Sequence, residues 1–157
     1  TWASVSCATR PMRPGARDGV EYRFVSRAQF AGMVENDELL EHAEFAGNCY
    51  GTPRAAVRQH LDAGTPALLE IELQGARQIR AQLPDAFLVF LTAPSWQELE
   101  RRLAGRGTES PDVVADRLGR ARVELAAESE FDAVVVNDDV GRAAAELVAL
   151  VEAVRAR

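Results

Sequence analysis

The sequence predicts a single α/β domain, built on a parallel β-sheet with helices on both of its faces. Three short apolar segments are predicted as buried strands, and each is followed by a helical pattern. The length of 157 residues suits one domain with a sizeable core. With 47% hydrophobic and 27% charged residues, the composition is typical of a globular chain.

The predicted strands of the parallel sheet span Ala67–Ile71, Ala86–Thr92 and Ala133–Val136. Such near-continuous apolar runs are typical of strands that are buried on both faces. Another strand-like segment, Trp2–Ser6, opens the chain. The alternation of these strands with helices is the pattern of a parallel sheet.

Local signals mark the helix starts. Ser26 and Ser95 each stand three residues before a glutamine or glutamate, which is the spacing of a capping box. Thr52-Pro53 and Ser110-Pro111 place a capping residue before a proline at the first helical position. The last helix is expected from about Val140, because apolar residues follow it along one stripe.

Helix ends and turns are marked by glycine. Gly64 and Gly105 lie where helices are expected to stop. Residues 10–52 break the α/β rhythm with two strand-like segments and a turn, Glu21–Val25, Leu39–Phe45 and Gly47-Asn48. We interpret them as a small antiparallel insertion of the kind that commonly holds a substrate.

Charge and cysteine content limit the function. The net charge is −6, which disfavours a nucleic-acid partner, and all 18 basic residues are arginine, so no lysine is available for Schiff-base or phosphate chemistry. Cys7 and Cys49 form no metal-binding spacing with His42 or His60. With no signal peptide and no apolar run of membrane-spanning length, we expect a cytoplasmic protein that binds no membrane.

An arginine pair lies in a proline-stiffened loop near the start of the chain. Arg10 and Arg13 are three residues apart, and guanidinium groups match phosphate oxygens in bidentate fashion. The pair therefore indicates a phosphate site, and a solvated basic loop is the alternative.

The segment Glu41–Thr52 joins a carboxylate on a strand to a tight turn and then to a Tyr50-Gly-Thr52 sequence. A carboxylate can accept hydrogen bonds from the N1–H and 2-amino groups of guanine, a pattern that adenine cannot supply. Tyr50 is suited either to donate to a phosphate or to cover the core. For Glu41 the alternative is a solvent-facing strand residue.

Two acids end the first predicted strand of the sheet. Glu70 and Glu72 lie at its carboxyl end, where parallel α/β sheets bind ligands. They are suited to the water shell of a magnesium ion or to the polar edge of a nucleotide. Ordinary polar residues at a strand end would show the same alternation.

A Gly105-Arg106-Gly107 connector joins two predicted helices, the second of which carries Arg117, Arg120 and Arg122. An arginine at the tip of such a connector suits a lid that closes over a phosphoryl group in transfer. The alternative is a surface turn, with the helix arginines paired to Glu124 and Glu128.

Five of these segments, in this order and spacing, resemble the guanylate kinase family. They are Thr9–Gly15, Asp18–Ser26, Gly47–Thr52, Glu70–Gly75 and Gly105–Glu109. The resemblance covers essentially residues 1–157. It implies a phosphate-loop nucleoside monophosphate kinase fold, with a GMP-binding insertion at about residues 10–52 and a helical lid at about residues 101–122.

The resemblance also implies roles for single residues. In family members the phosphate of GMP is held at the positions of Arg10, Arg13, Tyr22 and Tyr50. Guanine is read at those of Ser6, Glu41, Thr52 and Glu72. During transfer Arg10, Arg106 and Arg117 act on the phosphates, Asn137 lies near the donor adenine, and Glu70 belongs to the water shell of Mg²⁺.

The implied reaction is the ATP- and Mg²⁺-dependent phosphorylation of GMP to GDP by a monomer or small homo-oligomer. Ala16 stands where the family usually has glutamate, and Glu70 and Glu72 replace two aspartates. The family's N-terminal strand and its Gly-x-x-x-x-Gly-Lys-Ser/Thr phosphate loop do not occur in the sequence. We therefore expect a longer protein and an inactive chain without that loop; a phosphopeptide-binding module of the same family is the alternative.

Overall fold

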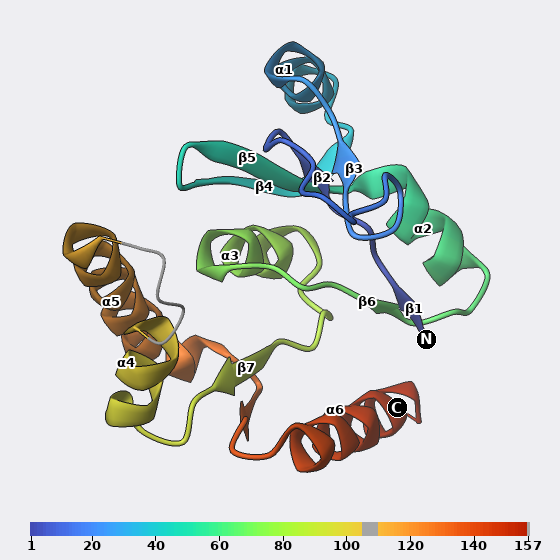
Figure 1. The fold of residues 1–157 in the computed structure, drawn as a ribbon. Coiled ribbons are helices and arrows are strands. Elements are labelled where there is room, and N and C mark those ends of the chain that lie inside the picture. The colour runs from blue at the N-terminus through green and yellow to red at the C-terminus, as the bar shows by residue number, and fades with distance from the viewer. Residues whose placement is uncertain (105–109, 157) are drawn as a thin grey trace. The chain divides into compact units, whose positions relative to one another are not determined.

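The computed structural model describes residues 1–104 and 110–156 of the chain. They form a mixed α/β fold in two compact units, Thr1–Ala86 and Phe87–Arg157. Most helices and strands of both units are labelled in Figure 1. None of the helices in the described residues is long and apolar enough to cross a membrane.

The first unit holds a short parallel ladder and a four-stranded sheet. In the ladder, β1 (Trp2–Ala3) pairs with β6 (Ala67–Leu68). The four-stranded sheet has the order β3-β2-β5-β4, with β4 at one edge. Its strands are β2 (Cys7–Ala8), β3 (Arg23–Phe24), β4 (Leu39–Phe45) and β5 (Asn48–Pro53).

The sequence led us to expect an antiparallel sheet here, but one of its strand pairs is parallel. β5 runs antiparallel to both β2 and β4, whereas β3 runs parallel to β2. The parallel pairing is possible because the loop between β2 and β3 is long enough to return the chain to the start of β2. The sheet also begins before the predicted insertion, at Cys7.

A tight hairpin joins β4 to β5. Its two turn residues are Ala46 and Gly47, and both have positive φ, 50° and 76°. Positive φ at both central residues is the pattern of a type I′ turn, whose twist matches that of the strands. The predicted turn at Gly47-Asn48 was therefore one residue too late. Asn48 already belongs to β5, and its side-chain amide donates to the Ala46 carbonyl oxygen.

Three helices complete the first unit: α1 (Arg27–Glu35), α2 (Arg54–Asp62) and α3 (Leu73–Gln82). The predicted capping box of α1 is confirmed, since Ser26 and Gln29 bond reciprocally. For α2 the prediction was wrong. Pro53 is the N-cap, and the Thr52 hydroxyl bonds to Glu41 instead of the helix. The chain leaves α2 through Gly64, as expected, with φ of 71°.

The buried core of the sheet contains Cys7, Phe30 and Leu39. Val25, Met33 and Cys49 pack against it, so that α1 lies on one face of the sheet. Cys7 and Cys49 are free thiols, and burial raises the pKa of Cys7.

In the second unit β7 pairs in parallel with β8, with Val89 opposite Ala133. The elements of this unit are β7 (Val89–Thr92), α4 (Trp96–Ala104), α5 (Pro111–Ala126), the 3-10 helix η1 (Glu128–Glu130), β8 (Ala133–Val136) and α6 (Val140–Arg155). Ser110 is the N-cap of α5 and Pro111 follows at N1, as predicted. Ser95 accepts from the Glu98 N–H, but the Glu98 carboxylate bonds to arginines and leaves the predicted box half formed.

β8 has the predicted bounds, whereas β6 and β7 are shorter than predicted. The strands are also not buried on both faces, since Leu68, Leu91 and Val134 are 49%, 54% and 38% exposed. Within the described residues each of these ladders is two strands wide. Successive side chains of a strand point to opposite faces, so alternate residues are exposed where one face is only partly covered.

Candidate functional site

An open cavity of about 410 Å³ lies in the first unit. This volume is within the range of small-molecule sites. Six of the residues singled out in the sequence line it: Ser6, Tyr22, Glu41, Tyr50, Glu70 and Glu72. The cavity therefore brings together residues from four separate segments of the chain.

Glu41 is the buried acid of this cavity. It lies on β4, is 5% exposed, and its Oε1 accepts a hydrogen bond of 2.6 Å from the Thr52 hydroxyl. The two residues are cross-strand partners in the β4–β5 ladder, which explains why their side chains meet. Burial raises the pKa of Glu41, the negative charge of Glu72 adds to this, and the hydrogen bond from Thr52 opposes it.

Thr52 itself is fully buried and is not one of the lining residues. Its hydroxyl donates to Glu41, so its position is behind the carboxylate and away from the cavity. Thr52 is thus a partner of Glu41 in this structure, although the sequence predicted it as a guanine contact.

Glu72 is the N-cap of α3, and its Oε1 accepts a 2.6 Å hydrogen bond from the Gly75 N–H. A carboxylate at a helix N-terminus satisfies an otherwise unpaired donor and is favoured by the helix dipole. One oxygen of Glu72 is therefore engaged in the local fold, while the residue still lines the cavity. The sequence did not predict this capping role.

Aromatic rings form another part of the lining. Tyr22 and Tyr50 meet edge to face, with 5.9 Å between their ring centroids. The Arg10 guanidinium lies 4.9 Å from the Tyr22 centroid and 5.4 Å from that of Phe24. A guanidinium over aromatic rings is held by cation–π attraction, so Arg10 is positioned beside the tyrosine side of the cavity.

The second arginine of the loop lies apart from the lining. Arg13 is exposed, and its carbonyl oxygen accepts from the Ala16 N–H in a turn through Gly15, whose φ is 85°. The structure thus places Arg10 against the lining residue Tyr22, although neither Arg10 nor Arg13 lines the cavity itself.

Three lining residues with polar or aromatic side chains were not predicted: Ser4, Glu21 and Phe45. The Ser4 hydroxyl oxygen is buried and has no hydrogen-bond partner in the described part of the chain. A signal was present, because Ser4 and Ser6 are two residues apart on an extended segment and so share a face. An orphan buried hydroxyl costs free energy unless a ligand or water satisfies it.

The second unit holds Asn137 and Arg117, whereas Arg106 lies outside the described residues. Asn137 follows β8, and its backbone is held on both sides. Its N–H donates to Thr92 over 2.7 Å, and its carbonyl accepts from Arg102 over 2.9 Å. Arg117 is a partly buried residue of α5.

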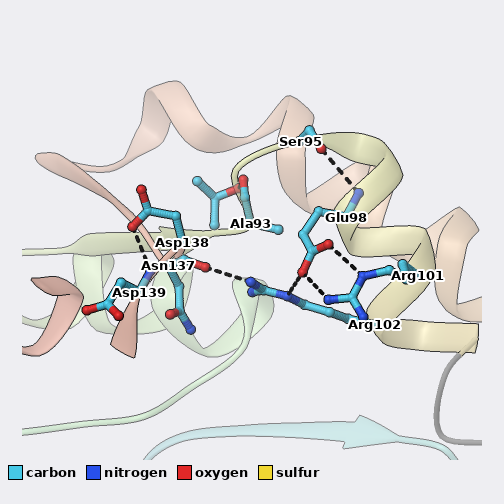
Figure 2. A network of polar contacts seen from close by, with 9 residues as sticks. Ala93, Ser95, Glu98, Arg101, Arg102, Asn137, Asp138 and Asp139 are labelled. Atoms are coloured by element: carbon cyan, nitrogen blue, oxygen red, sulfur yellow. Dashed lines mark hydrogen bonds and ion pairs between the residues drawn. The ribbon is translucent and has the colours of Figure 1, made fainter. Parts of the chain in front are cut away.

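Arg102 was not predicted as a site residue, yet it connects α4 to the end of β8 (Figure 2). Its Nε donates to Glu98, which also accepts two hydrogen bonds from Arg101. The Arg101 and Arg102 guanidinium groups lower the pKa of Glu98 to about 2. This network therefore stays ionised and holds Asn137 through a chain of charge-assisted bonds.

Two other arginines of α5 make contacts that the sequence did not predict. Arg120 forms an ion pair of 3.2 Å with Asp116, one turn earlier on α5. Arg122 packs its guanidinium over the Trp96 ring, 5.0 Å from the centroid. Arg122 thereby joins α5 to α4.

Comparison with solved structures supports a nucleotide kinase fold. The crystal structure of guanylate kinase from Anaplasma phagocytophilum matches with a TM-score of 0.85 and 33% identity, over 99% of this chain and 76% of that one. Guanylate kinase of Frankia casuarinae is 63% identical over 149 residues, which are 95% of this chain and 81% of the relative. Guanylate kinase of Thermobifida fusca is 62% identical over 97% of this chain and 78% of the relative.

A family model for guanylate kinase matches residues 1–154. The chain belongs to the guanylate kinase family, and its enzyme class is that of the nucleoside monophosphate kinases. The family resemblance seen in the sequence is thus confirmed.

Proposed function

We propose that the cavity of the first unit binds GMP and that the enzyme transfers the γ-phosphoryl group of ATP to it, giving ADP and GDP. The observation that carries the proposal is a buried carboxylate, Glu41, on the lining of a nucleotide-sized cavity. The names of the relatives agree, since each of the two quoted above is a guanylate kinase.

Glu41 suits the guanine base. Guanine presents two neighbouring donors, N1–H and the 2-amino group, whereas adenine presents an acceptor at N1 and has no 2-amino group. A carboxylate that is 5% exposed pays a desolvation cost that paired donors relieve, so a base without them is rejected. Ser6 and Glu72 are the further base contacts that we propose, and Thr52 would act by holding Glu41.

The phosphate of GMP is assigned to the tyrosine side of the cavity. Tyr22 and Tyr50 carry hydroxyl donors, and Arg10 lies against Tyr22. Guanidinium groups bind phosphate in bidentate fashion, so Arg10 is our first candidate and Arg13, in the same loop, the second. Residues 10–52 would then form the GMP-binding insertion.

In the proposed reaction a phosphate oxygen of GMP attacks the γ-phosphorus of ATP in line. The bond from that phosphorus to its bridging oxygen breaks, and ADP leaves. Arg10 would orient the acceptor phosphate, while Arg106 and Arg117, from a lid at about residues 101–122, would stabilise the charge. Asn137 is proposed to lie on the side of the donor adenine.

ATP-dependent kinases of this kind use Mg²⁺ to neutralise phosphate charge. No group of three or more His, Cys, Asp or Glu side chains that could hold a metal ion gathers in residues 1–104 and 110–156. Carboxylates suit the ion through its water shell, which Mg²⁺ gives up reluctantly. Glu70, a lining residue, is our candidate for that outer contact.

Calorimetric titration with GMP and with AMP tests the acceptor site without the phosphoryl donor. We expect saturable GMP binding and much weaker AMP binding. Glu41→Gln should lower GMP affinity about 10- to 100-fold, as expected for a hydrogen bond to a charged group, and should leave AMP binding nearly unchanged. Equal binding of GMP and AMP by the folded wild-type protein would reject the proposal.

The same titration addresses the phosphopeptide-binding alternative. A phosphoserine peptide needs the arginines and Tyr50 but has no use for the guanine-reading carboxylate. Tight peptide binding that survives Glu41→Gln, together with no GMP binding, would favour the alternative. A cytoplasmic location and a monomeric or small homo-oligomeric state remain predictions.

A further inference from the structure

We propose that Gln78 and Gln82 of α3 are positioning residues for Glu41 and thereby determine base specificity. The inference rests on the proposed binding of GMP in the cavity. Neither glutamine lines the cavity. Both act, in this account, through the backbone of the strand that carries Glu41.

Among the described residues β4 is an edge strand, so the backbone groups on its outer side have no strand partner there. Such groups need other partners, and here α3 supplies them. The His42 N–H donates to Gln78 Oε1 over 3.0 Å, and Gln78 Nε2 donates to the His42 carbonyl over 2.7 Å. One side-chain amide thus bonds to both backbone groups of His42, as a residue of an adjacent strand would.

Gln82 makes the second attachment, one helical turn further on. Its Nε2 donates to the Leu40 carbonyl oxygen over 2.7 Å. Leu40 lies at an irregularity of the β4–β5 ladder, where the register shifts between Leu39 and Glu41. A bulge leaves its extra residue unpaired and changes the direction of nearby side chains. Gln82 therefore holds the backbone at the bulge that sets the direction of the Glu41 side chain.

The two attachments flank Glu41 directly, because they fall on the residues before and after it. The carboxylate itself also lies against α3. A Cβ atom added to Gly75 would stand 2.4 Å from Glu41 Oε2. The same helix begins at Glu72, whose carboxylate caps it. One rigid helix therefore sets the positions of two of the cavity acids, Glu41 and Glu72, relative to each other.

The test compares GMP with IMP, which lacks the 2-amino group. Wild type, Gln78→Ala and Gln82→Ala are titrated with both nucleotides, with Gln59→Ala on the exposed surface of α2 as the matched control. We expect each α3 variant to lower the GMP-to-IMP affinity ratio about threefold to tenfold, because Glu41 loses its alignment with the guanine donors. The control should keep the wild-type ratio.

Combination with Glu41→Gln separates positioning from general stability. If the glutamines act through Glu41, Gln78→Ala should change the ratio no further in the Glu41→Gln background. The inference is overturned if a glutamine variant melts at a lower temperature and loses affinity for GMP and IMP equally. The unchanged affinity ratio would then show a purely structural role. The proposed function fails separately, if wild type shows no preference for GMP over IMP.

Discussion

The Thr52 hydroxyl donates a 2.6 Å hydrogen bond to the Glu41 carboxylate across the β4–β5 ladder, and both residues are buried. Because both residues are buried, the bond compensates for part of the hydration that an ionised carboxylate loses there. The stability of this part of the sheet and the charge of the cavity are therefore linked through one hydroxyl group.

Two substitutions at Thr52 separate the hydroxyl from the methyl group. Thr52→Val keeps the shape but removes the donor, and we expect it to lower the free energy of unfolding by about 2 kcal/mol at neutral pH. Thr52→Ser keeps the donor and should lower the free energy of unfolding by less. Urea unfolding measures both, and equal losses in the two variants would mean that packing, and not the hydrogen bond, matters at this position.

Glu41 should make stability and GMP binding depend on pH in opposite directions. Its pKa is raised above the ordinary 4.5, so the folded protein binds this proton more tightly than the unfolded chain does. Relative to Glu41→Gln, the free energy of unfolding of wild type should fall as the pH rises from 4.5 through the raised pKa. GMP affinity should rise over the same interval, because the carboxylate is the form that accepts from guanine.

Unfolding curves and GMP titrations at a series of pH values check both trends. Glu41→Gln serves as the reference because it cannot titrate at this position. A GMP affinity that follows the same pH profile in both proteins would mean that another group governs the dependence.

Gly75→Ala should weaken GMP binding while leaving the protein folded. The added Cβ would stand 2.4 Å from Glu41 Oε2, so the carboxylate must move. We expect GMP affinity to fall about tenfold, since small displacements of a binding group have large effects. Gly119→Ala on α5 is the matched control, because an added Cβ there has nothing within 4 Å.

The control should stabilise the protein by about 1 kcal/mol through helix propensity and keep the GMP affinity of wild type. Thermal unfolding and calorimetry distinguish the two effects. Unchanged GMP affinity in folded Gly75→Ala would show that Glu41 can move without consequence for binding.

Glu98→Gln should loosen the connection between α4 and Asn137. Glu98 accepts from Arg101 and Arg102, and its pKa is lowered to about 2. A carboxyl with a lowered pKa stabilises the fold above its ordinary value of 4.5, and this contribution is lost as the pH falls towards about 2. Wild type should therefore melt at a higher temperature than the variant at neutral pH, with the difference shrinking in acid.

Thermal melts over that pH range provide the measurement. Glu152→Gln, on the exposed surface of α6, controls for the loss of one negative charge. If the difference in melting temperature between wild type and Glu98→Gln stays the same down to the lowest pH, the role given to the ion pairs is contradicted.

Local signals in the sequence predicted the local structure well. The Ser26 box, the Ser110-Pro111 start and the bounds of β8 all depend on neighbouring residues, and all are confirmed. The family and the α/β class could also be predicted, since they depend on many motifs at once.

The predicted hydrogen-bond partners were wrong for residues that can bond either within their own segment or to a distant one. Thr52 has the sequence context of a helix cap, but strand register brings it opposite Glu41, and the hydrogen bond to a buried carboxylate prevails. For Glu72 the local partner prevails: it was predicted as a ligand contact, but its carboxylate caps its own helix. The roles of Gln78 and Gln82 depend on which strand lies at the sheet edge, which no local pattern indicates.

A crystal structure of the protein with GMP tests the central claim most directly. The account predicts guanine N1–H and the 2-amino group within hydrogen-bond distance of the Glu41 carboxylate, and the phosphate beside Tyr22, Tyr50 and Arg10. A nucleotide bound with its phosphate against Glu41, or with its base outside this cavity, would contradict it.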